Sequence, residues 1–95
     1  MHVEKAIATE IEPKLNDVFG LSTTRSLLTM ATLAYVTSAG GKIQRYRALV
    51  DSICSDELVI DRWGEATAAK QAKDWKDLVP LEPDIAVIVA PQASG

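Results

Sequence analysis

Residues 22–54 read STTRSLLTMATLAYVTSAGGKIQRYRALVDSIC, and they carry the clearest helical pattern in the chain. Its first half, Ser22–Ala39, is apolar over most of the circumference of a helix, which is typical of a helix that is central to a bundle or buried by a partner subunit. Its second half, Lys42–Cys54, is amphipathic at the three- and four-residue spacing of an α-helix. Because only Gly40 and Gly41 separate the two halves, they predict a helical hairpin.

The N-terminal segment is also predicted to be helical. Its apolar residues recur at helical spacings of four, at Val3, Ile7 and Ile11. Pro13 lacks a backbone N–H and restricts Glu12, so this segment forms either a kinked helix or two short helices. Gly20 is a natural helix end, and the hydroxyl residues at positions 22–24 are the expected N-cap of the next helix.

Two further helical segments follow the hairpin. The sequence Ser55-Asp56-Glu57 places an N-cap and acidic residues at a helix start, where both are favourable. The residues of this helix that are expected to face the core are Leu58, Val59 and Trp63. Gly64 either ends the helix or lies inside a longer one. Between Glu65 and Val79 the apolar residues again share one side, at Ala68, Ala72, Trp75 and Val79.

The C-terminal residues differ in character from the rest of the chain. Ile85, Ala86, Val87, Ile88 and Val89 form a continuous apolar and mostly β-branched run between two prolines, which predicts an extended strand. A lone strand leaves its backbone groups unpaired, so this run must pair with another segment or lie in a groove. We therefore predict a helical domain over residues 1–80 and an extended tail over residues 81–95. The fold class is an all-α bundle of four to five helices with a short extended C-terminal segment.

The composition limits the classes of function. The 95 residues are 47% hydrophobic and 24% charged, which is typical of one globular domain. The net charge of −3 argues against a general nucleic-acid binder, and a single cysteine excludes an intrachain disulfide and a multi-cysteine zinc site. The N-terminus lacks the apolar core of a secretory signal, and no apolar run approaches the roughly 20 residues of a membrane span. The expected location is the cytoplasm.

Catalytic chemistry has little support in the sequence. Cys54 continues the apolar stripe of its helix, and His2 is the only histidine, so a cysteine–histidine pair would require the N-terminus to fold back onto that helix. A buried structural cysteine is the favoured interpretation. We assign no catalytic residue and no cofactor, and an enzyme is the least favoured class.

A divalent-metal or small-ligand site is one alternative. Glu57, Asp61 and Glu65 recur every four residues, which would place three carboxylates on one helix face. Such spacing is more often a solvated acidic surface, because charged residues are rarely buried.

A small DNA-binding regulator is the other alternative. A helix, a glycine turn and a second helix are the outline of a helix-turn-helix, and the second helix would present Lys42, Gln44, Arg45 and Arg47. The acidic chain and the apolar preceding helix argue against this interpretation, so nucleic acid is the less favoured partner.

The preferred function is a non-enzymatic protein–protein interaction module or small accessory subunit that self-associates. The Ser22–Ala39 helix and the run Ile85–Val89 carry more apolar surface than a monomer of this size can easily cover, and such surface marks interfaces. The expected contact residues of the tail are Ile85, Val87, Ile88 and Val89. The basic residues Lys42, Arg45 and Arg47 are expected to form a patch that attracts the acidic residues of a second copy or of a partner protein.

Overall fold

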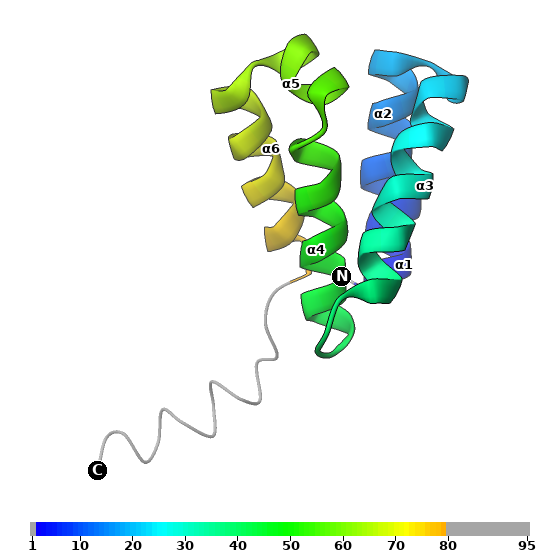
Figure 1. The fold of residues 1–95 in the computed structure, drawn as a ribbon, viewed down its shortest axis with the longest axis vertical. Helices are drawn as coiled ribbons and strands as arrows, with labels where there is room; N and C mark the ends of the chain where they lie inside the picture. The colour runs from blue at the N-terminus through cyan, green and yellow to red at the C-terminus, as the bar shows by residue number, and fades with distance from the viewer. Residues whose placement is uncertain (1, 80–95) are drawn as a thin grey trace.

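The computed structural model describes residues 2–79, which form an all-α bundle (Figure 1). The elements are α1 (Val3–Ala6), the π-helical η1 (Ile7–Ile11), α2 (Glu12–Phe19), α3 (Leu21–Thr37), α4 (Lys42–Cys54), α5 (Glu57–Trp63) and α6 (Glu65–Asp77). Because α1, η1 and α2 follow one another without a break, the described residues contain five helical rods. The predicted fold class is confirmed, whereas the run 85–89 lies outside the described residues.

Helix α4 occupies the centre of the bundle. It packs against α3 on one side and α6 on the other, and it also touches α1 and α5 (Figure 1). Its predicted apolar stripe is almost fully buried, with Tyr46 and Val50 at 0% exposure and Ile53 at 1%. The more apolar helix α3 therefore lies beside the central helix, against α2 and α4, and does not occupy the centre itself.

The N-terminal rod is continuous from Val3 to Phe19, but it is not a regular α-helix. Glu12 N–H bonds to the carbonyl of Ile7, five residues back, in the wider turn of a π-helix. Two features of the sequence explain this turn. Pro13 cannot donate to the carbonyl four residues before it, and core residues spaced by four drift about 40° per step around an ideal α-helix. The wider turn reduces that drift, so Val3, Ile11 and Leu15 all remain buried.

Two glycines in the left-handed region separate neighbouring helices. Gly20, at φ 85°, ends α2 and is also the N-cap of α3. The hydroxyl N-cap expected at positions 22–24 is therefore wrong, because α3 begins at Leu21 with no side-chain cap. Gly64, at φ 83°, separates α5 from α6. The predicted cap of α5 is confirmed, since Leu58 N–H donates to Asp56 Oδ1 at 2.9 Å.

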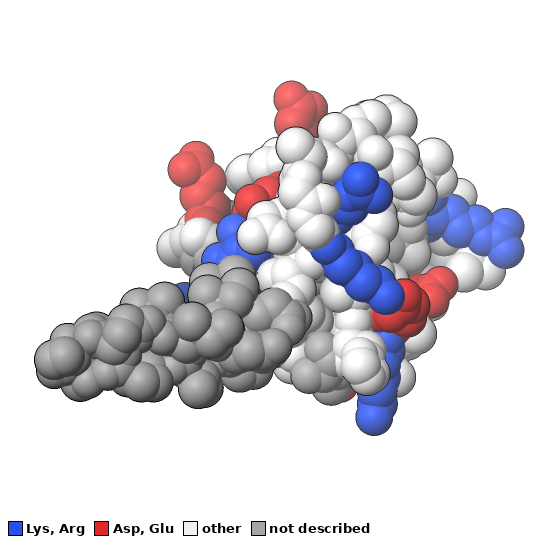
Figure 2. Space-filling model, turned by 90° about the horizontal axis from the view of Figure 1, so that it is seen from below, with Lys and Arg blue, Asp and Glu red and all other residues white. Residues whose placement is uncertain are grey.

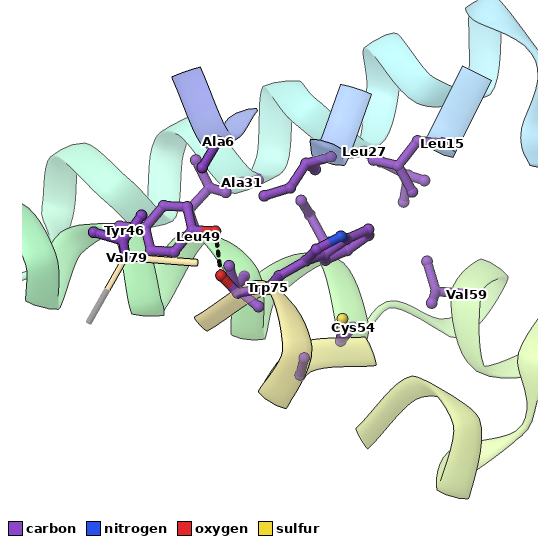
Figure 3. Packing of buried hydrophobic residues seen from close by; sticks show 14 of the residues in the cluster. Ala6, Leu15, Leu27, Ala31, Tyr46, Leu49, Cys54, Val59, Trp75 and Val79 are labelled. Atoms are coloured by element: carbon purple, nitrogen blue, oxygen red, sulfur yellow. Dashed lines mark hydrogen bonds between the residues drawn. The ribbon is translucent and has the colours of Figure 1, made fainter. Parts of the chain in front are cut away.

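Helix α6 covers the other side of α4 with the stripe that the sequence predicts. Ala68, Ala72, Trp75 and Val79 are all buried, at 2%, 9%, 3% and 4% exposure (Figure 3). The Tyr46 hydroxyl donates to the Trp75 carbonyl at 2.5 Å and joins α4 to α6 inside the core (Figure 3). Burial raises the pKa of Tyr46 to about 12, so the hydroxyl stays protonated and remains a donor at neutral pH.

Helix α5 is joined to the bundle by aromatic contacts. The Trp63 ring lies between the rings of Phe19 and Trp75, at centroid distances of 5.9 Å and 6.1 Å, within the range of favourable aromatic pairs. Val59 is fully buried, but Leu58 is 50% exposed, so the prediction that Leu58 faces the core is wrong. Successive residues of an α-helix point about 100° apart. Because Val59 and Trp63 face the bundle, the adjacent Leu58 points toward solvent.

Candidate interaction surface

Helix α3 has apolar side chains on two sides, and only one side is covered. Leu27 and Ala31 are buried at 2% and 0% exposure against the rest of the bundle. Met30, Leu33 and Val36 remain 57%, 54% and 57% exposed. These three residues are spaced by three along the helix, so they lie on the same, outward side.

The outward side also carries small hydroxyl residues. We define the outer α3 face as the exposed residues Ser26, Thr29, Met30, Leu33, Val36 and Thr37. The Thr29 and Thr37 hydroxyls donate to the carbonyls of Arg25 and Leu33, each at 2.8 Å. Because these hydroxyls already have partners within their own helix, covering them costs less than covering a hydroxyl that is bonded to water.

The outer α3 face carries no charge. Arg25 is the only charged residue of α3, and none occurs from Ser26 to Ala39. A shallow groove of about 420 Å³ lies on the flank of α3 that includes Arg25 and Leu28. The outer α3 face therefore combines exposed apolar side chains with two internally bonded hydroxyls and no charge, and depletion of charge is typical of the centre of a protein–protein interface.

The basic residues that the sequence groups together point in different directions. Lys42 Nζ contacts Glu4 Oε2 of α1 at 2.5 Å, and this hydrogen bond lowers the pKa of Glu4 and raises the pKa of Lys42. Arg45 and Arg47 are two residues apart on α4, so their side chains leave the helix about 160° apart. Arg45 Nε is buried without a hydrogen-bond partner among the described residues.

Arg47 lines a different surface, a groove of about 450 Å³ between α4 and α6. Two ion pairs border this groove, Lys76 Nζ to Asp51 Oδ1 at 2.6 Å and Lys73 Nζ to Asp77 Oδ2 at 3.0 Å. Seen from the end of the bundle, basic and acidic side chains are interspersed on the visible surface (Figure 2). Arg47 therefore lies among the charged residues of α4 and α6, whereas Lys42 lies beside Glu4 of α1. Gln44 packs against the glycine link, where a Cβ atom on Gly40 would come within 3.1 Å of the Gln44 Cβ.

The three acidic candidates for a metal site do not share one helix face. Glu57 and Asp61 lie on α5, whereas Glu65 is the first residue of α6. The left-handed backbone of Gly64 interrupts the helix between them, so the expectation of a common face is wrong. Within residues 2–79, no group of three or more His, Cys, Asp or Glu side chains is placed to hold a metal ion.

Cys54 lies at the end of α4 and is 8% exposed. Burial, and secondarily the charge of Asp51, raises the pKa of the Cys54 thiol to about 11. The thiol is therefore protonated at neutral pH, and a protonated thiol is a poor nucleophile and a poor metal ligand. The geometry agrees with a structural role for Cys54.

No helix within residues 2–79 has both the length and the hydropathy that a membrane crossing requires. Comparisons with protein-family models, with curated proteins and with solved structures found no match.

Proposed function

We propose that this chain is a non-enzymatic interaction module that self-associates through the outer α3 face. The observation that carries the proposal is the exposure of Met30, Leu33 and Val36, each by more than half, on a helix side without charge. Contiguous exposed apolar side chains mark interaction sites in soluble proteins. Contact between two copies is isologous, so each patch meets its own duplicate. An uncharged patch can meet its duplicate without repulsion.

The expected strength of this association is moderate. Complete burial of a large apolar side chain stabilises by about 1.5–3 kcal/mol, so covering the exposed half of one is worth about 1 kcal/mol. A contact between two copies covers three such side chains from each. Because association also costs translational and rotational freedom, we expect a concentration-dependent equilibrium rather than a permanent dimer.

A pair of matched variants tests the role of the outer α3 face. Leu33→Glu places a charge at the centre of the face, and Thr32→Glu places the same charge on an exposed residue of the same helix outside it. We expect Leu33→Glu to weaken self-association by about tenfold or more, because a charge without a partner is costly to bury. Thr32→Glu should associate like the unchanged protein. Size-exclusion chromatography with light scattering measures both, and circular dichroism checks that both variants are folded.

The salt dependence separates this face from contact between charged patches. Association through the uncharged face should change little between low and high ionic strength, whereas pairing of Lys42, Arg45 and Arg47 with acidic residues should weaken as salt screens the charges. Equal association of Leu33→Glu and the unchanged protein, together with strong salt dependence, would contradict the proposal and favour charged contacts.

A further inference from the structure

We infer that two copies of the chain pair with their α3 helices antiparallel, across a two-fold axis that passes beside Leu33. This inference rests on the proposed self-association and specifies its geometry. Apart from Ser26, the outer α3 face is symmetrical about Leu33, since Met30 and Val36 lie three residues to either side and Thr29 and Thr37 lie four. The face therefore presents the same order of side chains to a partner helix that runs in either direction.

The sizes of the side chains are compatible with an antiparallel pair. Residues seven apart lie close to the same line along a helix, so Met30 and Thr37 share one edge of the face, and Thr29 and Val36 share the other. In an antiparallel pair, Met30 of one copy lies opposite Thr37 of the other, and Thr29 lies opposite Val36. Each large side chain then meets a small one, as interdigitating helices require. A parallel pair would place Met30 opposite Thr29 and Val36 opposite Thr37, so the side-chain sizes fit both directions and the charge of α3 must distinguish them.

The single charge of α3 favours the antiparallel direction. Arg25 is exposed at the N-terminal end of the helix and forms no ion pair within residues 2–79. An antiparallel pair places Arg25 near the C-terminal end of the partner helix, whose last carbonyls carry partial negative charge. A parallel pair would place Arg25 near Arg25 of the second copy, and it would align the two helix dipoles.

The C-terminal end of α3 is suited to receive that arginine. The C-cap positions of α4 and α6 form backbone hydrogen bonds to the preceding turn. Helix α3 ends at Thr37 with an extended C-cap residue, Ser38, and no such bond is found there within residues 2–79. The neighbouring cation Lys42 is directed to Glu4. The last carbonyls of α3 thus lack a backbone partner at the point where Arg25 of a second copy would arrive.

Disulfide cross-linking tests the direction of pairing. Cysteine is introduced singly at Met30 or Thr37 in full-length Cys54→Ala protein, and the two variants carry tags of different mass. A disulfide requires Cα atoms within about 7 Å. Antiparallel pairing brings residue 30 of one copy opposite residue 37 of the other, whereas two residues at position 30 are offset by about 9 Å along the helix. We expect an oxidised equal mixture to form the mixed dimer in several-fold excess over both homodimers.

Three other outcomes are possible, and each contradicts either the antiparallel direction or the self-association itself. Homodimers in excess would show parallel pairing, so the antiparallel inference would fail while self-association through the outer α3 face would stand. Dimers by light scattering without cross-links at either position would show that another surface makes the contact, and both statements would fail. A chain that stays monomeric at all concentrations would remove the proposed function itself. Circular dichroism of each variant checks that the new cysteine leaves the helices intact.

Discussion

The Tyr46 hydroxyl forms one of the few described polar contacts between helices that are distant in the sequence. It donates to the Trp75 carbonyl at 2.5 Å, and both residues are nearly inaccessible to solvent. Tyr46→Phe leaves the carbonyl buried without this donor, so we expect it to lower the free energy of unfolding by about 1–2 kcal/mol. Tyr35→Phe is the control, because no hydrogen bond of the Tyr35 hydroxyl is found within residues 2–79. Urea unfolding of both variants makes the comparison, and equal losses would contradict the role of the bond.

Alkaline pH should weaken the fold through two buried groups. Burial raises the pKa of Cys54 from 9.0 to about 11 and the pKa of Tyr46 from 10.0 to about 12. Because each folded-state pKa exceeds the unfolded value, the stabilisation is complete below the unfolded pKa and is lost as pH rises through the folded pKa. We expect the midpoint of urea unfolding to fall from pH 9.0 to about 12.

Two variants separate these contributions. Cys54→Ala should flatten the decline below pH of about 11, and Tyr46→Phe should flatten it toward about 12. A decline of the same size in both variants and in the unchanged protein would show that neither group causes it.

The environment of some residues follows from the sequence, whereas that of others depends on contacts between helices. Burial of Trp75 follows from helical spacing alone, because it lies in line with alanines that leave room for it. The outward direction of Leu58 does not follow, because α5 is a short helix and its rotation is set by the Phe19–Trp63–Trp75 contacts. The hydrogen bond from Tyr46 also leaves no local signal, since its acceptor is a backbone carbonyl that is 29 residues away.

Among the elements, the α5–α6 junction depends on one backbone conformation. Gly64 has φ 83°, which other residues adopt with strain, and a Cβ atom there would meet nothing within 4 Å. We expect Gly64→Ala to lower the free energy of unfolding by about 1 kcal/mol, through the backbone alone. Gly41→Ala is a matched control, because its φ of −83° suits alanine and its added Cβ would lie 3.5 Å from Gln44 Oε1. Urea unfolding should show a smaller loss for Gly41→Ala, because both glycines are helix N-caps but only Gly64 has a positive φ.

The bounds and orientation of some helices can be predicted from the sequence more closely than those of others. The bounds of α4 coincide with the predicted 42–54, because one clear apolar stripe follows a pair of glycines. The sequence does not determine which side of α3 faces the core, because apolar residues occupy most of its circumference and several rotations would fill the core. Its polar stripe at Arg25, Thr29 and Thr32 runs along one edge of the outward side, and this is the signal that could identify Met30, Leu33 and Val36 as exposed. The predicted acidic face is absent for a different reason, because Gly64 has a positive φ and interrupts the helix between Asp61 and Glu65.

For the whole molecule, the tail offers a second test of association. The run Ile85–Val89 lies outside the described residues, and its sequence predicts an extended segment that needs a partner. We expect a chain that ends at Pro80 to associate more weakly or to aggregate. Sedimentation velocity compares it with the full chain. An identical monomer before and after truncation would remove the tail from the interface, whereas loss of association only in Leu33→Glu would assign the interface to α3 alone.

One copy of the chain leaves an apolar side of α3 uncovered, and we propose that a second copy covers it. The most direct test is the solution mass of the unmodified full chain by sedimentation equilibrium, from micromolar to millimolar concentration. We predict a mass that rises from 10.3 kDa toward twice that value. A mass that stays at 10.3 kDa over the whole range would contradict the claim.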